Sequence, residues 1–165
     1  MIRLLMFVCI LISHLNALTW HELNQKQKHI AKTIYRVVDN LDLRLALLSI
    51  AWQESRLGVA SINLQDPSCG VFHTHLKYYN QRYGLKDDDY TRNVLCARLI
   101  DDLVFSIREA KRQLRTWLVV HNGDFEKALK SYNAGYNVSA GNGYYANIMK
   151  HKKAFLTMIE NGELR

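Results

Sequence analysis

Apolar residues recur at steps of three and four positions along most of the chain, which is the spacing typical of amphipathic helices. The longest stripe ends near Trp117 and suggests a long central packing helix. The helices expected from these stripes and their flanking turn residues cover 22–39, 42–56, 75–83, 91–120, 124–132 and 144–159. No pair of segments shows the period-two alternation of a sheet. The pattern predicts an all-α, single-domain fold of five to six helices.

Two segments between these helices are rich in turn-forming residues and are expected to be loops. The first, 59–74, contains an Asp-Pro-Ser run at 66–68 and Gly70, and the second covers 133–143. The 165 residues are 48% hydrophobic and contain no repeat or low-complexity tract. This composition suits one compact domain that follows an N-terminal leader.

The leader, residues 1–17, has the pattern of a secretory signal peptide. Arg3 precedes an apolar run at 4–12, and Ala17 offers a cleavage site. The run is shorter than the ~20 apolar residues of a membrane-spanning helix. We therefore expect export to the periplasm or cell envelope. Leu15 is not the small residue typical of a cleavage site, so a retained anchor is the alternative.

Removal of the leader would leave two cysteines, Cys69 and Cys96. In an oxidising compartment they could form one disulfide. The alternative is that Cys96 is a small buried apolar residue on its helix.

The chain is basic, with 22 Lys and Arg residues against 15 Asp and Glu and a formal net charge of +7. Such a charge speeds encounters with nucleic acid, anionic lipid or the acidic bacterial wall without choosing among them. Because we expect export, we expect no nucleic-acid partner. Each local cluster, such as 111–115 or 150–153, is best interpreted as the solvated face of a helix.

Glu54 is singled out by its place on an apolar stripe. Steps of three, four and seven residues back lead to Ala51, Ile50 and Leu47. Charged side chains rarely occupy such positions unpaired, and a partly enclosed carboxyl is a candidate general acid. The alternative is a glutamate at a helix end that reaches water beside Gly58.

Four segments, in order, resemble the motifs of the lysozyme-like lytic transglycosylases. Residues 49–58 (Ser-Ile-Ala-Trp-Gln-Glu-Ser-Arg-Leu-Gly) are similar to the family's Glu-Ser motif, where a helix ends on the catalytic glutamate. Residues 70–75 are similar to its glycine-apolar-apolar-glutamine motif, and 131–135 (Ser-Tyr-Asn-Ala-Gly) to its Ala-Tyr-Asn-Ala-Gly motif. Residues 144–148 resemble its final tyrosine motif. The resemblance spans 43–149 and implies the family's all-α lysozyme-like core.

The resemblance implies that Glu54 is the catalytic residue of a peptidoglycan lytic transglycosylase. Glu54 would protonate the glycosidic oxygen between N-acetylmuramic acid and N-acetylglucosamine and then accept the proton of the muramoyl 6-hydroxyl, which gives a 1,6-anhydro product. Ser55 would bond near the carboxyl, Tyr132 and Asn133 would hold the carboxyl and the acetamido group, and Tyr145 would close the site. The full set of implied substrate-binding residues is Ser55, Gly70, Phe72, His73, His75, Tyr132, Asn133 and Tyr145.

The chain departs from the family pattern at two positions in the substrate cleft. His73 stands where the family usually has glutamine, and His75 where methionine is common. Imidazole can still donate a hydrogen bond to a sugar, but it makes binding sensitive to pH near 6 to 7. The His-x-His pair lacks a third ligand of suitable spacing, so we expect no metal and no cofactor.

Two other functions are compatible with these residues. A hydrolase similar to goose-type lysozyme would use water instead of the 6-hydroxyl, with Asp66 as a candidate for positioning that water. A basic, non-catalytic wall-binding protein is the more distant alternative. The expected partners are peptidoglycan glycan strands, with either phage lysis proteins or a secretion or conjugation machine, and the chain is expected to be a monomer.

Overall fold

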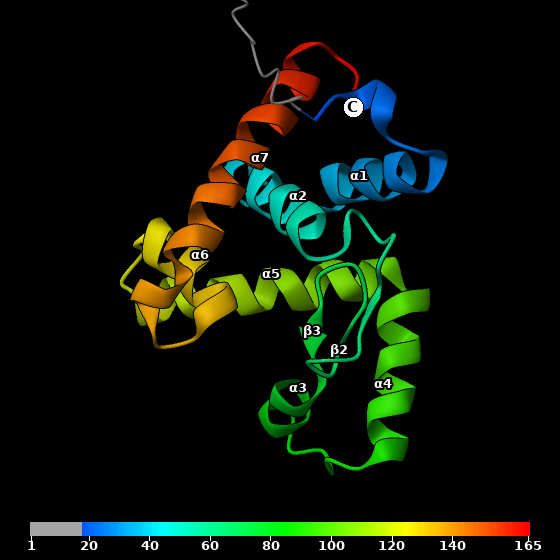
Figure 1. Cartoon of the computed structure of the whole chain (residues 1–165), viewed down its shortest axis with the longest axis vertical. Coiled ribbons are helices and arrows are strands. Elements are labelled where there is room, and N and C mark those ends of the chain that lie inside the picture. Colours follow the sequence, from blue (N-terminus) through cyan, green and yellow to red (C-terminus); the bar gives the residue numbers. More distant parts are fainter. Residues whose placement is uncertain (1–17) are drawn as a thin grey trace, which may run out of the picture.

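The structure is a computed structural model that describes residues 18–165, and its architecture is largely all-α (Figure 1). The predicted signal peptide, 1–17, lies outside the described residues. Seven α-helices are present in the described part: α1 (Gln25–Val37), α2 (Leu41–Ser55), α3 (Leu76–Arg82), α4 (Asp89–Asp101), α5 (Leu103–Val120), α6 (Phe125–Ala134) and α7 (Asn142–Glu160). Two short 3₁₀ helices, Trp20–Glu22 and Val138–Gly141, precede α1 and α7.

The expected loop at 59–74 contains a small sheet that the sequence pattern did not predict. Strands β1 (Ile62–Asn63), β2 (Ser68–Cys69) and β3 (Thr74–His75) pair antiparallel in the order β1-β2-β3. Each strand has only two residues, which is too short for side-chain alternation to show in the sequence. The fold is largely all-α as expected, but the expectation that this segment has no strands is wrong.

The single helix expected at 91–120 is two helices, α4 and α5, which is one reason why the helix count exceeds five to six. Asp102 separates them, with backbone angles of φ −102° and ψ 88°. Its carboxylate accepts a hydrogen bond from the Phe105 N–H at 2.9 Å and so caps the start of α5. The apolar stripe continues across this break, because Ile100 and Leu103 keep the helical spacing.

Helix α2, rather than the 91–120 stretch, is the most enclosed helix. Nearly every residue from 43 to 51 is buried, and α2 packs against α1, α5 and α7. A helix that is apolar on all sides needs such a central position. The largest fully buried side chains around it, which we call the main core, are Ile34, Leu47, Leu48, Ile50, Leu57, Phe72, Ile107, Leu114, Leu129, Ile148 and Phe155.

A separate small core lies between the sheet, α3 and α4. Its buried residues are Cys69, Leu76, Leu95 and Leu99, and Tyr79, Cys96 and Phe105 pack against them. The structure joins Cys69 to Cys96 by a disulfide with a Cα–Cα distance of 5.2 Å, which confirms the disulfide interpretation of these residues. The bond fastens β2 to α4.

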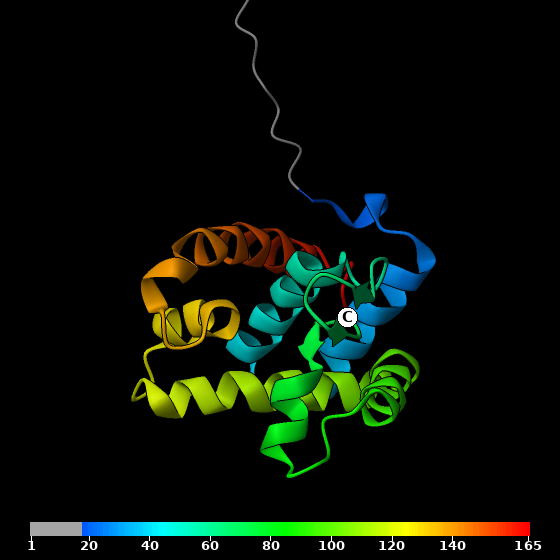
Figure 2. The same cartoon turned by 60° about the horizontal axis from the view of Figure 1, so that its bottom comes forward.

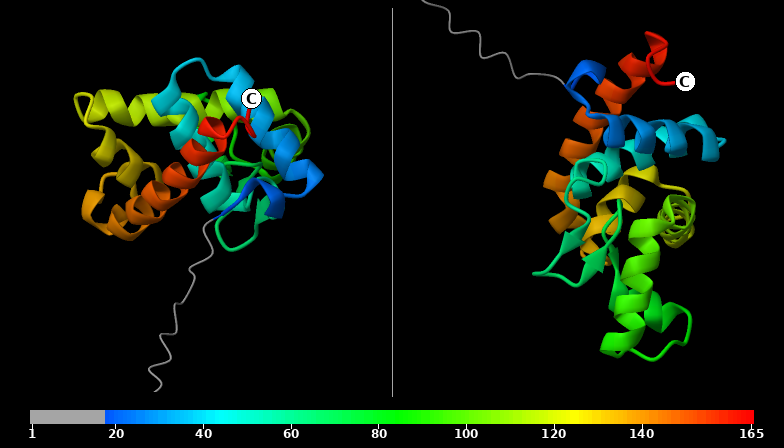
Figure 3. Two further views of the ribbon diagram at one scale, coloured as in Figure 1. Left: turned by 90° about the horizontal axis from the view of Figure 1, so that it is seen from above. Right: turned by 90° about the vertical axis from the view of Figure 1, so that its right-hand side faces the viewer.

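Helix α5 crosses the molecule between the two cores. Figure 1 shows α1, α2 and α7 on one side of it and the sheet, α3 and α4 on the other. Figure 2 shows α6 between α7 and one end of α5, and the right-hand view of Figure 3 shows α1 above the sheet and α4. The first described residues lie beside the C-terminus, where His21 and Glu163 approach to 3.7 Å.

Candidate active site

The carboxyl-terminal end of α2 places Glu54 at the border of the main core. Three successive residues after the helix, Arg56, Leu57 and Gly58, have positive φ angles of 52°, 53° and 79°. This left-handed run stops the helix and turns the chain back, and Leu57 is fully buried. Glu54 thus lies one residue before the end of a rigid helix, as the Glu-Ser motif implies.

Ser55 fixes this turn and does not bond the Glu54 carboxyl. Its hydroxyl donates to the Val71 carbonyl at 2.6 Å and accepts from the Gly58 N–H at 2.8 Å. The hydroxyl also lies 3.1 Å from the Ala51 carbonyl. Ser55 therefore ties the 70–75 segment to the end of α2 from a fully buried position.

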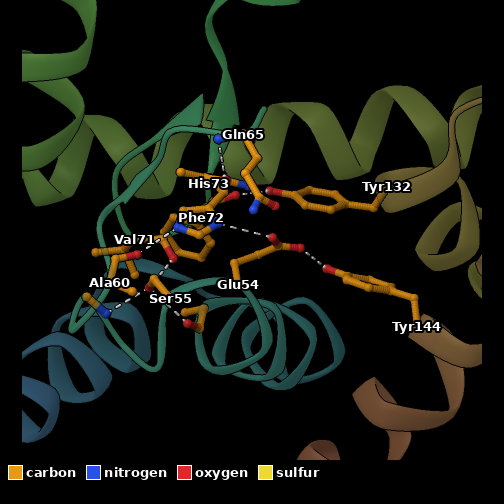
Figure 4. Close-up of polar contacts among 12 residues, drawn as sticks. Glu54, Ser55, Ala60, Gln65, Val71, Phe72, His73, Tyr132 and Tyr144 are labelled. Carbon is orange, nitrogen blue, oxygen red and sulfur yellow. Dashed lines mark hydrogen bonds and ion pairs between the residues drawn. The ribbon is translucent and has the colours of Figure 1, made fainter. Parts of the chain in front are cut away.

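Both oxygens of the Glu54 carboxyl have a partner (Figure 4). The Tyr144 hydroxyl donates to Oε1 at 2.7 Å, and His73 Nδ1 lies 3.5 Å from Oε2. The Glu54 side chain keeps 18% of its surface exposed. It lines a cavity of about 800 Å³ that also receives residues from the sheet, α3, α5 and α6. The carboxyl is thus held in place and still open to a ligand.

His73 reaches Glu54 from a left-handed backbone position with φ 44°. Its Nε2 lies 2.7 Å from the Ala60 carbonyl oxygen, and its side chain is only 12% exposed. The contact with Glu54 is the largest influence on the pKa of His73 and raises it above the ordinary 6.5, although burial acts in the opposite direction. The Glu54 carboxyl thus makes His73 hold its proton more tightly than a free imidazole does.

The buried Tyr132 and the half-buried Tyr144 lie beside the same carboxyl. The Tyr132 hydroxyl points to the Phe72 carbonyl at 3.5 Å, and Tyr132 lines the cavity (Figure 4). Burial, reinforced by the nearby Glu54 charge, raises the pKa of both Tyr132 and Tyr144 well above the ordinary value of 10. Both hydroxyls therefore stay protonated at neutral pH and act as hydrogen-bond donors.

Some of the other residues that the resemblance implies for substrate binding line the cavity, and others lie in the interior. Asn133 and His75 line the cavity. Phe72 is 1% exposed and belongs to the main core, so only its backbone faces the site. Gly70 is required by the packing, because φ is 82° and a Cβ atom would lie 2.8 Å from the Leu99 carbonyl oxygen.

Tyr144, not the adjacent Tyr145, donates a hydrogen bond to the Glu54 carboxyl. Tyr145 packs against the main core and lies near the Lys130 ammonium, 5.5 Å from its ring centre. Helical spacing signals this difference, because Tyr144 shares a stripe on α7 with the fully buried Ile148 and Phe155. The motif alone did not show which of two consecutive tyrosines faces Glu54.

His75 turns to a different partner from His73. Its Nε2 lies 2.8 Å from Asp66 Oδ1, and its ring packs on Tyr78 with ring centres 4.3 Å apart. Asp66 also lines the cavity, with 61% of its side chain exposed. Within residues 18–165, no group of three or more His, Cys, Asp or Glu side chains is placed to hold a metal ion.

The far wall of the cavity contains polar and aromatic residues that the motifs did not indicate. Glu109 on α5 is almost fully buried, accepts from the Tyr83 hydroxyl at 3.0 Å and pairs with Arg112 at 3.0 Å. Burial raises the pKa of Glu109, while Arg82 and Arg98 act against this. Aromatic rings also line the cavity, from α3, α5 and the loop after α6: Tyr78, Tyr79, Trp117 and Tyr136.

Comparisons with known proteins give one relative and no family. No protein-family model matches the chain, and no solved structure matches it. The chain is similar to a protein of Enterobacteria phage T4 described as an uncharacterized 20.7 kDa protein in the vs-regB intergenic region. The two are 32% identical over 109 residues, which are 63% of this chain and 58% of the relative. The matched part thus spans less than two thirds of the relative's length. Among residues 18–165, no helix has both the length and the apolar character to cross a membrane.

Proposed function

We propose that this chain is a peptidoglycan lytic transglycosylase with Glu54 as its general acid and base. The observation that carries the proposal is the Glu54 carboxyl, which opens into the cavity while Tyr144 and His73 hold its two oxygens. A carboxyl that exchanges a proton with a bound sugar needs this combination of fixed geometry and access.

In the proposed reaction, protonated Glu54 gives its proton to the glycosidic oxygen after the muramoyl sugar, and the C1–O bond breaks. The muramoyl 6-hydroxyl oxygen then bonds to C1, and its proton passes to the Glu54 carboxylate. The product is a 1,6-anhydro sugar, no water is consumed, and Glu54 ends in its starting form. The Tyr144 hydroxyl stabilises the carboxylate between the two steps, because it donates to Oε1 at 2.7 Å.

The position of the four motif segments supports a lysozyme-like arrangement of the helices. The end of α2, the 70–75 turn, the end of α6 and the start of α7 are separated by up to 90 residues, yet all contribute a group at or beside Glu54. Their convergence on one carboxyl is what the resemblance requires. We include this arrangement in the proposal.

The cavity suits a glycan strand. Its aromatic rings, Tyr78, Tyr79, Trp117 and Tyr136, offer apolar faces for the C–H faces of sugars. Its polar groups provide hydrogen bonds for hydroxyl and acetamido groups, and the net charge of +7 favours approach to an acidic wall.

The proposed setting is outside the bacterial cytoplasm. The Cys69–Cys96 disulfide suits an oxidising compartment, as does the signal-peptide pattern of 1–17. The phage T4 relative favours a role in phage lysis or entry over one in a secretion or conjugation machine.

A hydrolytic outcome is the second candidate, because Asp66 lines the same cavity as Glu54. His75 holds the Asp66 carboxylate at 2.8 Å and leaves much of it exposed, so it could bind a water molecule. If water replaced the 6-hydroxyl, each cleavage would add one water to the products.

Mass spectrometry of purified peptidoglycan digested by the protein tests the proposal. We expect anhydro-muropeptides from the wild type and a rate lower by about a hundred- to ten-thousand-fold for Glu54→Gln. Glu160→Gln, which makes the same change at an exposed position at the end of α7, is the matched control and should digest normally. Hydrated products that disappear in Asp66→Asn would establish the hydrolase instead, and an unchanged wall treated with folded protein would contradict both reactions.

A further inference from the structure

The contact between His73 Nε2 and the Ala60 carbonyl fixes which ring nitrogen faces the catalytic acid. A carbonyl oxygen can only accept a hydrogen bond, so Nε2, at 2.7 Å from it, carries a hydrogen. In the neutral ring the other nitrogen, Nδ1, is then a bare acceptor. This nitrogen is the one that lies 3.5 Å from Glu54 Oε2. The basic site of the imidazole therefore points at the carboxyl.

Glu54 and His73 consequently form a pair that can share one proton. If the proton is on Glu54, the carboxyl O–H faces an acceptor nitrogen. If the proton is on Nδ1, an imidazolium faces a carboxylate, whose other oxygen accepts from Tyr144. Both forms are complementary across the 3.5 Å between Nδ1 and Oε2.

We propose that His73 is a positioning residue that acts through Glu54 as its proton store: Nδ1 keeps the pair's single proton within reach of the carboxyl, so that Glu54 remains able to act as an acid at higher pH than it could alone. This role rests on the proposed function of Glu54. A glutamine, the usual residue of the resembled family here, could bond the Ala60 carbonyl but could not store a proton.

The charges around the ring favour this storage. Glu54 on α2 and Asp66 between β1 and β2 both raise the pKa of His73, as does the bond to Ala60, against the opposing influence of burial. The Tyr132 and Tyr144 hydroxyls beside Glu54 have raised pKa values that keep them neutral. His75 faces Asp66, 2.8 Å away, and Arg82 also lines the cavity. Among Glu54, His73, Tyr132 and Tyr144, the proton that Glu54 and His73 share is therefore the first to be lost as the pH rises.

The proton count closes over one turnover. Glu54 gives the shared proton to the glycosidic oxygen, which leaves a carboxylate beside a neutral imidazole. The substrate's 6-hydroxyl then returns one proton to the carboxylate, and the pair again holds one. No exchange with solvent is needed, so activity should persist until the pair has lost its last proton.

The backbone of His73 supports a dedicated placement of the ring. A φ of 44° is uncommon for a residue other than glycine and costs of order 1 kcal/mol. The surrounding contacts hold this conformation, which turns the ring edge between Ala60 and Glu54 (Figure 4).

The pH profile of kcat tests the proposal in wild type, His73→Gln and the matched control His29→Gln. His29 is exposed on α1, so its substitution removes a histidine outside the cavity. We expect the alkaline limb of His73→Gln to move to lower pH by about one unit or more, within the gap of about two units between ordinary histidine and glutamic acid. His29→Gln should keep the wild-type limb. A merely structural role of His73 would lower kcat at every pH without moving the limb.

A titration of the His73 ring by nitrogen NMR provides a readout that does not depend on turnover. In the wild type, the neutral ring should carry its hydrogen on Nε2, and in Glu54→Gln the pKa of His73 should fall because its main partner loses its charge. A neutral ring with its hydrogen on Nδ1, or a titration that Glu54→Gln does not change, would overturn the proposal.

The outcomes separate this proposal from the function on which it rests. Anhydro products with an unmoved alkaline limb in His73→Gln would contradict proton storage and leave the transglycosylase reaction standing. Failure of the folded wild type to digest peptidoglycan at any pH would overturn the reaction and, with it, this role of His73, whatever the NMR titration shows.

Discussion

The two cores stabilise opposite walls of the same cavity by different means. The main core contains eleven of the largest fully buried apolar side chains, drawn mostly from helices and grouped around α2. The small core has four buried residues, three two-residue strands and one disulfide. Glu54 lies on α2, at the border of the main core, whereas His75 lies in β3 and Asp66 in the turn between β1 and β2. Glu54 is thus on the wall with more buried apolar side chains, and the wall with fewer contributes His75 and Asp66 to the cavity.

The largest expected difference between the two cores is the cost of an apolar cavity. Leu47 and Leu99 are both fully buried leucines, one in each core. We expect Leu47→Ala to lower the free energy of unfolding by about 4–5 kcal/mol, because the surrounding helices cannot collapse into the gap. Leu99→Ala should cost about 2–3 kcal/mol, at the lower end for such changes.

Urea unfolding with hydrogen exchange checks both variants. Leu47→Ala should speed exchange throughout the described helices, whereas Leu99→Ala should speed it mainly in α3, α4 and the sheet. Equal costs and equally global exchange would show that the two cores unfold as one unit.

The next largest loss in the free energy of unfolding is expected when the disulfide is removed. Cys69 and Cys96 close a loop with a sequence separation of 27, for which loop entropy gives about 3–4 kcal/mol. We expect the Cys69→Ala/Cys96→Ala double variant to lose up to this amount and to lose it in the small core. Thermal unfolding gives the stability, and exchange of the α4 amides gives the location. A variant as stable as the wild type would mean that the three buried leucines of the small core suffice without the bond.

The sequence predicts the main core better than the small one, for a physical reason. A helix such as α7 shows its packing face as an apolar stripe, and the observed helix starts and ends within two residues of the expected 144–159. The strands are too short to show a period, and the break at Asp102 depends on a cap that the continuing stripe conceals. The spacing of apolar residues therefore predicts helices that pack along their whole length. It does not predict short strands or helix breaks, which depend on single turns and caps.

The residues of the candidate site also divide into those that the sequence predicts and those that it does not. Glu54, Tyr132, Asn133, His73 and His75 were named from the motifs and line the cavity. The roles of the remaining residues depend on three-dimensional detail: Ser55 bonds the backbone, and Phe72 is core. Tyr144 occupies the place expected for Tyr145.

The two adjacent tyrosines offer a smaller but sharper test. Tyr144→Phe removes a donor to the Glu54 carboxylate and should lower kcat by about ten- to a hundred-fold, the effect of one hydrogen bond to a charged group. Tyr145→Phe should have a smaller effect, since its ring packs against the main core. Steady-state kinetics on peptidoglycan, with circular dichroism as the folding control, compares them. A larger loss in Tyr145→Phe would contradict the arrangement in Figure 4.

The smallest expected effect is a pH dependence of the free energy of unfolding that comes from the His73–Glu54 contact. This contact raises the pKa of His73 in the folded protein above its ordinary 6.5, so the folded state binds that proton more tightly than the unfolded state. The stabilisation from His73 is therefore complete below pH 6.5, and it is lost as the pH rises through the pKa of His73 in the folded protein. Urea midpoints should show a wild-type advantage over His73→Gln that is larger near pH 6 than near pH 8.5, by up to about 1 kcal/mol. Backbone strain at φ 44° is the same at both pH values, so it cancels in this difference. In a Glu54→Gln background the difference between the two pH values should shrink, because His73 has lost the charge of its main partner. A stabilisation by His73 that grows with pH would mean that His73 is held neutral and does not pair with Glu54.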